Sequence, residues 1–149
     1  MKKTLFILLG IFTFVSAQKN VSKKLPVVKC VVSGDQIDLE ESSSYKDGEV
    51  YFCCGGCKMD FDEDSKKFST NANFQLLATK QYTQTSCPMT GGKTKVDKIV
   101  AVNGAKISFC CNNCVKKATK SDDKLSLLFT DASFDKGFTS VKVKLKKKI

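Results

Sequence analysis

Eight cysteines are the residues of this sequence best suited to chemistry, and they form two sets of four. Each cysteine of the first set returns 57 positions later in the second: Cys30, Cys53, Cys54 and Cys57 become Cys87, Cys110, Cys111 and Cys114. Thiolates without imidazole select soft metal ions such as Cu(I) and Zn(II). Because the chain contains no His, the usual acid–base partner is missing, and we expect a metal-binding protein that is not an enzyme.

The constant offset indicates a duplicated module of roughly fifty residues. In the second copy, Asn103-Gly104 lies between two apolar runs and predicts a β-hairpin, since both residues tolerate positive φ. Asp47-Gly48 predicts the corresponding turn in the first copy. We therefore expect the second strand of each hairpin to end at Cys53 or Cys110.

A short helix is expected after each hairpin, over residues 58–68 and 115–128, with breaks at Asp64-Ser65 and Ser121-Asp122. This order brings a thiol at the end of a strand close to one in the first helical turn, where the helix dipole favours thiolate. The ligand sets predicted are Cys30, Cys53, Cys57 and Cys87, Cys110, Cys114. Neighbouring strand residues point to opposite sides, so Cys54 and Cys111 are either fourth ligands or nearby thiols.

The number of thiolates bears on the metal. Three suit trigonal Cu(I), and four suit tetrahedral Zn(II) with about 2.3 Å to each sulfur. The three-coordinate set and the expected export favour copper, and zinc stays open.

Three other interpretations compete with metal handling. Eight cysteines in an exported chain would also suit a disulfide framework. A closed structural zinc site would only fold an interaction module. The two CxxC sequences, Cys54 to Cys57 and Cys111 to Cys114, match the spacing of a thiol–disulfide oxidoreductase, but no thioredoxin-like βαβ pattern surrounds them.

The N-terminus has the features of a cleaved secretory signal: a basic start, an apolar run and small residues before Gln18. We expect a periplasmic or secreted protein with no membrane span after cleavage. The formal charge of +10 comes from Lys alone, since the chain lacks Arg, and we expect no nucleic-acid partner. The organisation expected is a signal peptide at 1–17, a linker at 18–26, a first unit at 27–70, a linker at 71–83, a second unit at 84–130 and a basic tail at 131–149.

The cysteine spacing in both copies resembles that of the TRASH-type metal-binding domain: 22 residues separate Cys30 from Cys53, and three separate Cys53 from Cys57. The sequences Cys87-Pro88-Met89-Thr90-Gly91 and Tyr51-Phe52-Cys53-Cys54-Gly55-Gly56-Cys57, with Phe61, Asp64, Lys67 and Phe68 downstream, resemble the related YHS domain. The resemblance implies two tandem treble-clef-like units of a small α+β fold. It also implies a role in sensing, trafficking or resisting heavy metals, with a metal-transport or resistance protein as partner.

Overall fold

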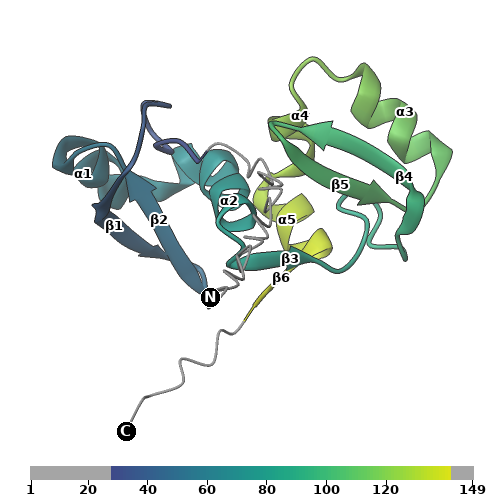
Figure 1. Ribbon diagram of the computed structural model, residues 1–149, viewed down its shortest axis with the longest axis horizontal. Helices are drawn as coiled ribbons and strands as arrows, with labels where there is room; N and C mark the ends of the chain where they lie inside the picture. The colour runs from purple at the N-terminus through teal and green to yellow at the C-terminus, as the bar shows by residue number, and fades with distance from the viewer. Residues whose placement is uncertain (1–27, 142–149) are drawn as a thin grey trace, which may run out of the picture.

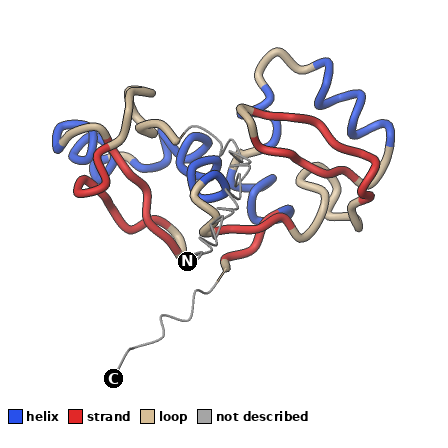
Figure 2. Tube along the Cα trace, viewed as in Figure 1, coloured by secondary structure: helices blue, strands red, loops and turns tan. Residues whose placement is uncertain are grey.

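The computed structural model describes residues 28–141 (Figures 1 and 2). The predicted signal peptide and the whole of the first linker lie outside this range, as do residue 27 and residues 142–149 of the tail. The elements, in chain order, are β1 (Asp38–Tyr45), β2 (Gly48–Phe52), α1 (Gly55–Glu63), the 3-10 helix η1 (Ser65–Phe68), α2 (Ser69–Ala78), β3 (Tyr82–Gln84), β4 (Lys95–Val102), β5 (Ala105–Phe109), α3 (Asn112–Lys120), α4 (Lys124–Leu128), α5 (Asp131–Gly137) and β6 (Phe138–Ser140). The expectation of a small mixed α+β protein is confirmed.

Both predicted hairpins form, β1 with β2 and β4 with β5. Their second strands end at Phe52 and Phe109, one residue earlier than the predicted Cys53 and Cys110. The second turn falls at Asn103-Gly104, where φ is 45° and 86°. The first turn is one residue earlier than predicted, at Lys46-Asp47. Gly48 instead begins β2, where a Cβ would lie 2.6 Å from Oε1 of Gln81, so this glycine serves close packing rather than the turn.

Each hairpin has an irregularity at the same place in its first strand. The pairing of β1 moves from Asp38 opposite Phe52 to Ser42 opposite Tyr51. The same shift occurs in β4 between Lys95 and Ile99. Three extra residues therefore bulge from each first strand, 39–41 and 96–98. A β-bulge beside a site commonly re-aims side chains.

The predicted helix breaks are confirmed. α1 ends at Glu63 and η1 begins at Ser65, with the Asp64 side chain accepting a hydrogen bond from the Lys67 amide. In the second copy, α3 ends at Lys120 and α4 begins at Lys124, where Asp123 accepts from the Ser126 amide. An aspartate that caps the next helix satisfies N–H groups that would otherwise lack partners, which explains why each break occurs here.

The two copies meet over α2, α5 and a small sheet of β3 and β6, which lie between the hairpins in Figure 1. Residues 71–83, expected to link the units, thus contain most of α2 and the first two of the three residues of β3. Residues 131–140, assigned by sequence to the basic tail, form α5 and β6. The ring of Phe134 stacks on Phe138 at 5.0 Å and faces Tyr82 at 4.9 Å. Burial of these aromatic rings is a substantial part of what holds the two copies together.

Polar contacts around Asp131 also join the copies. Its carboxylate accepts hydrogen bonds from the Tyr45 hydroxyl at 3.2 Å and the Asn73 amide at 2.9 Å, and it pairs with Lys46 at 3.3 Å. Burial opposes ionisation of Asp131, but the bonds from Asn73 and Lys46 outweigh it and lower the pKa of the carboxyl group. Among residues 28–141, no helix has both the length and the apolar character needed to cross a bilayer.

Candidate metal centre

The first cysteine of each copy begins a tight loop. The Cys30 amide donates to the Asp35 carbonyl at 2.8 Å, and the Gly34 amide donates to the Cys30 carbonyl at 3.0 Å. Cys87, Gly91 and Gly92 repeat this arrangement with distances of 2.9 and 2.7 Å. Gly34 and Gly91 have φ of 79° and 75°, a conformation that favours glycine. The glycine allows the chain to turn back, which holds the cysteine at the base of the loop.

Two triads of sulfur atoms result, as the sequence predicts. The first triad is Cys30, Cys53 and Cys57, and the second triad is Cys87, Cys110 and Cys114; within each, all three sulfurs lie within 4.8 Å of one another. The Sγ atoms of Cys53 and Cys57 are 3.6 Å apart, and those of Cys110 and Cys114 are 3.8 Å apart. All eight cysteines are free thiols. Each triad can hold a metal ion.

Cys54 and Cys111 lie beside the triads, at the N-terminal ends of α1 and α3. The Cys54 sulfur is 3.8 Å from that of Cys53, and the Cys111 sulfur is 3.7 Å from that of Cys114. The backbone N–H of Cys57 is the main cause that lowers the pKa of the Cys54 thiol, and that of Cys114 does the same for Cys111. These two thiols are thus outside the triads but within reach of the same ion.

A hydroxyl group contacts the middle sulfur of each triad. Ser33 Oγ lies 3.3 Å from Cys53 Sγ, and Thr90 Oγ1 lies 3.2 Å from Cys110 Sγ. A hydroxyl beside a sulfur can donate to it and stabilise the thiolate. Ser33 and Thr90 are 57 residues apart, so both copies carry a hydroxyl residue at this position. The sequence alone does not show that this hydroxyl contacts a sulfur.

The thiols of each triad differ in acidity. Burial of Cys30 opposes its ionisation, but hydrogen bonds, chiefly from Ser33, lower the pKa to about 7. Cys87 likewise has a pKa of about 7, because bonds from Cys110 and Thr90 outweigh its burial. By contrast, the neighbouring Cys53 thiol and burial raise the pKa of Cys57 to about 12. One thiol in each triad is therefore prepared to bind metal as thiolate, and a metal ion must displace protons from the others.

Glutamine side chains join each cysteine loop to its hairpin. Gln75 of α2 accepts from the Tyr51 amide at 2.7 Å and donates to the carbonyls of Tyr51 and Lys29 at 2.9 and 2.8 Å. Lys29 directly precedes Cys30, and Tyr51 lies two residues before Cys53. The glutamine amide therefore fixes the distance between two cysteines of the first triad.

The second copy has the same three bonds from a glutamine elsewhere in the chain. Gln84 of β3 accepts from the Ser108 amide at 2.9 Å and donates to the carbonyls of Ser108 and Ser86 at 2.7 and 2.9 Å. Ser86 and Ser108 are the equivalents of Lys29 and Tyr51, whereas position 75 corresponds to Ala132. The repeat therefore gave no signal for either glutamine, and the sequence did not reveal their role.

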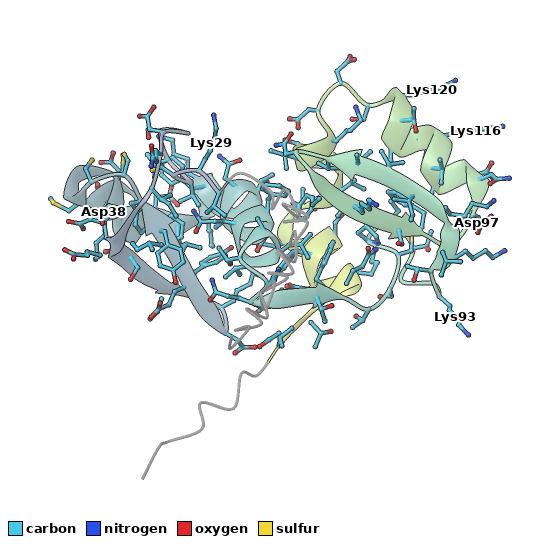
Figure 3. All side chains as sticks on the ribbon, viewed as in Figure 1. Lys29, Asp38, Lys93, Asp97, Lys116 and Lys120 are labelled. Carbon is cyan, nitrogen blue, oxygen red and sulfur yellow. The ribbon has the colours of Figure 1, made fainter. Side chains whose placement is uncertain are left out.

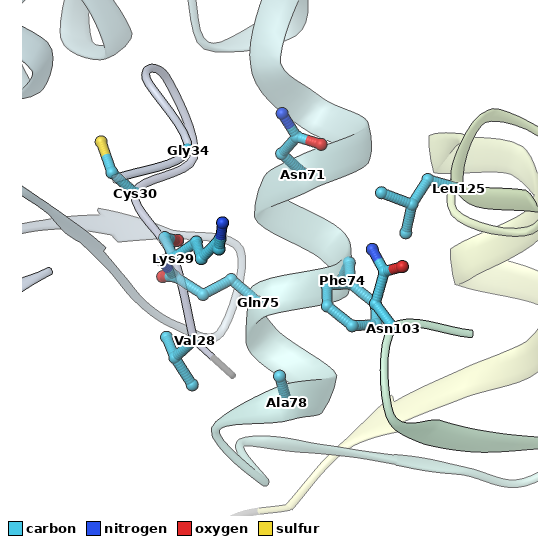
Figure 4. A pocket seen from close by; sticks show the side chains of 10 residues that line it. All are labelled: Val28, Lys29, Cys30, Gly34, Asn71, Phe74, Gln75, Ala78, Asn103 and Leu125. Atoms are coloured by element: carbon cyan, nitrogen blue, oxygen red, sulfur yellow. Dashed lines mark hydrogen bonds between the residues drawn. The ribbon is translucent and has the colours of Figure 1, made fainter. Parts of the chain in front are cut away.

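A cavity of about 430 Å³ lies behind the Cys30 loop, between α2 and the second hairpin turn, with Phe74, Asn103 and Leu125 in its wall. Figure 4 shows the Cys30 side chain pointing away from α2 and from this cavity. Cys30 and Gly34 are themselves lining residues, so the cavity adjoins the loop that carries the first cysteine of the triad.

The fold and the triads define a small α+β protein with two cysteine clusters able to hold metal. Comparisons with protein-family models, curated proteins and solved structures found no match for the chain. The argument for function therefore depends on the sulfur geometry.

Proposed function

We propose that the protein binds one soft metal ion, Cu(I) or Zn(II), in each triad and serves as a buffer, carrier or resistance factor rather than as an enzyme. The observation that carries the proposal is the convergence of three sulfurs to within 4.8 Å, twice in one chain. Thiolate ligands without imidazole are the donor set of soft metals.

The sulfur spacing fits the size of such an ion. Two sulfurs that lie 2.3 Å from one metal are about 3.8 Å apart at a tetrahedral angle and about 4.0 Å apart in a trigonal plane. The spacings of 3.6 and 3.8 Å are close to these values. A trigonal Cu(I) would use the triad alone, and a tetrahedral Zn(II) would also recruit Cys54 or Cys111.

Export to the periplasm or the exterior and a treble-clef-like origin of each unit complete the proposal. The apolar N-terminal segment supports export, and the spacing shared with TRASH and YHS domains supports the fold relationship. The partner proposed is a metal-transport or resistance protein that supplies or receives the ion.

Elemental analysis combined with thiol counting tests the proposal. The reduced mature protein should retain about one equivalent of copper or zinc per triad, and chelation should release the thiols for titration. Fully oxidised cysteines that take up no metal after reduction would instead favour a disulfide framework. A Cys53→Ser, Cys57→Ser double variant should lose one equivalent only, because the second triad has its own ligands.

A further inference from the structure

The two triads have the same ligands but differ in their exposure to solvent. In the first copy Cys54 is exposed and Cys57 is half-buried. In the second copy Cys111 is half-buried and Cys114 is only 5% exposed. Cys54 and Cys57 are therefore more exposed to solvent than their equivalents Cys111 and Cys114.

The residue that packs beneath each helix also differs between the copies. Under α1, the buried Phe61 ring contacts the rings of Phe52 and Tyr45 at 5.3 and 5.5 Å and fills the space toward the hairpin. The equivalent residue of α3 is Ala118, which is fully buried together with Cys114. The second copy therefore has a methyl group where the first has a ring, and its Cys114 is buried, whereas Cys57 is half-buried.

The surfaces around the triads also differ in charge. Residues 28–68 contain ten Asp or Glu and five Lys, a net charge of −5, whereas residues 85–141 contain five Asp and nine Lys, a net charge of +4. Figure 3 shows Asp38 on the first unit and Lys93, Lys116 and Lys120 on the second. Surface charge of one sign raises the local concentration of ions of the other sign and their association rate.

A reversal of charge occurs in the bulge beside each site. The Glu41 carboxylate reaches the N-terminal end of α1, with its oxygens 3.8 Å from where a Cβ of Gly55 would lie. The equivalent position in the second bulge is Lys98. A carboxylate therefore lies beside the helix start of the first triad. In the second copy this position of the bulge carries Lys98, whose ammonium group pairs with Asp97 at 2.6 Å.

We propose that the first triad exchanges metal ions with the surroundings and that the second triad retains its ion. The inference rests on the proposed metal binding and adds a division of labour between the copies. An incoming ligand must reach the metal through the shell of sulfurs, so exposure of Cys54 and Cys57 speeds exchange. Burial of Cys114 slows it, and the negative field of the first unit attracts the arriving cation.

Stopped-flow mixing of the reduced, metal-free mature protein with Cd²⁺ tests the inference, because Cd²⁺ bound to thiolate absorbs in the ultraviolet. Uptake should have two phases, with the first triad about tenfold faster. Raising the ionic strength should slow the fast phase, since salt screens the attraction of the acidic unit. Displacement of bound Cd²⁺ by a neutral dithiol should show the same order of rates.

A matched pair of charge variants assigns the phases without touching a ligand. Glu41→Lys should slow the fast phase severalfold and leave the slow phase unchanged. Lys98→Glu, its counterpart, should speed the slow phase only. Each phase can also be assigned with Cys53→Ser, Cys57→Ser and with Cys110→Ser, Cys114→Ser, each of which leaves one triad.

The outcomes separate the two proposals. A protein that binds no Cd²⁺, Zn²⁺ or Cu(I) would refute metal binding itself. Two equivalents taken up at one rate, or a fast phase that responds to Lys98→Glu, would overturn the division of labour and leave metal binding intact. The charge variants keep every thiol, so they test the division of labour between the triads even if the serine variants fail to fold.

Discussion

Replacement of Gln75 by Ala should weaken the first metal site without removing any ligand. The variant loses three hydrogen bonds. Two of them bind the backbone of Tyr51 in the hairpin, and the third binds the Lys29 carbonyl and so holds the cysteine loop. At about 1 kcal/mol for each bond, the free energy of unfolding should fall by about 3 kcal/mol. Gln75 is only 2% exposed, so water replaces these bonds poorly.

Of the three bonds, the one to Lys29 holds the cysteine loop, so its loss is the one expected to affect affinity. Its loss should cost about 1 to 1.4 kcal/mol of binding free energy, which is a five- to tenfold weaker first site. Urea unfolding of the metal-free protein measures the loss in the free energy of unfolding. Competition with a chromophoric chelator measures the metal affinity of the first site, once the second triad has been removed by Cys110→Ser and Cys114→Ser.

Gln81 offers a matched control, because its side chain binds the same strand, β2. Its side chain pairs with the amide and carbonyl of Glu49 at 2.7 Å each, four residues before Cys53 and away from the cysteine loop. Gln81 also donates to Thr79 Oγ1 at 2.9 Å, so Gln81→Ala should lower stability by about 3 kcal/mol and leave the first site's affinity unchanged. Equal losses of affinity in Gln75→Ala and Gln81→Ala would show that glutamine at position 75 acts through general stability, which would refute the positioning role.

Three further changes test other contacts. Ser33→Ala removes the hydroxyl 3.3 Å from the Cys53 sulfur and should weaken the first site severalfold in chelator competition, with the second site as internal control. Asp131→Asn should destabilise the protein by about 1 to 2 kcal/mol at pH 7. Because the pKa of Asp131 is lowered on folding, its stabilisation is present above the unfolded pKa near 4 and is lost as the pH falls through the folded pKa, so urea unfolding of variant and parent should converge in acid. Gly137→Ala would place a Cβ 2.8 Å from Cα of Pro88 and should lower both stability and second-site affinity; unchanged affinity would show that the cysteine loop moves freely relative to α5.

Much of the site follows from the sequence because its elements are local and repeated. Asn103-Gly104 specifies its turn by backbone preference, and a hairpin followed by a helix must bring Cys110 near Cys114. The repeat then transfers the same arrangement to the first copy. The one-residue error at Lys46-Asp47 arose because Gly48 was interpreted as a turn residue, whereas long-range packing against Gln81 explains it.

The contacts between the copies could not be predicted in this way. Gln75 and Gln84 perform one task from unrelated positions, so only the folded chain shows that they are equivalent. The pairing of β3 with β6 joins residues more than fifty positions apart, and neither three-residue strand has a pattern of its own. Likewise, Ala118 gave no indication that α3 would bury Cys114 more deeply than α1 buries Cys57.

The pairing of β3 with β6 also bears on how the chain arose. Tyr82 lies opposite Ser140, and Thr83 lies opposite Thr139. Moving each partner by the 57-residue offset of the cysteines exchanges these two pairs, so the register of the small sheet is symmetric with respect to the repeat. An isologous contact of this kind is the usual means by which two identical chains associate. A single half could make the same contact with a second copy of itself, so joining two halves in one chain would keep this contact while each site is free to differ.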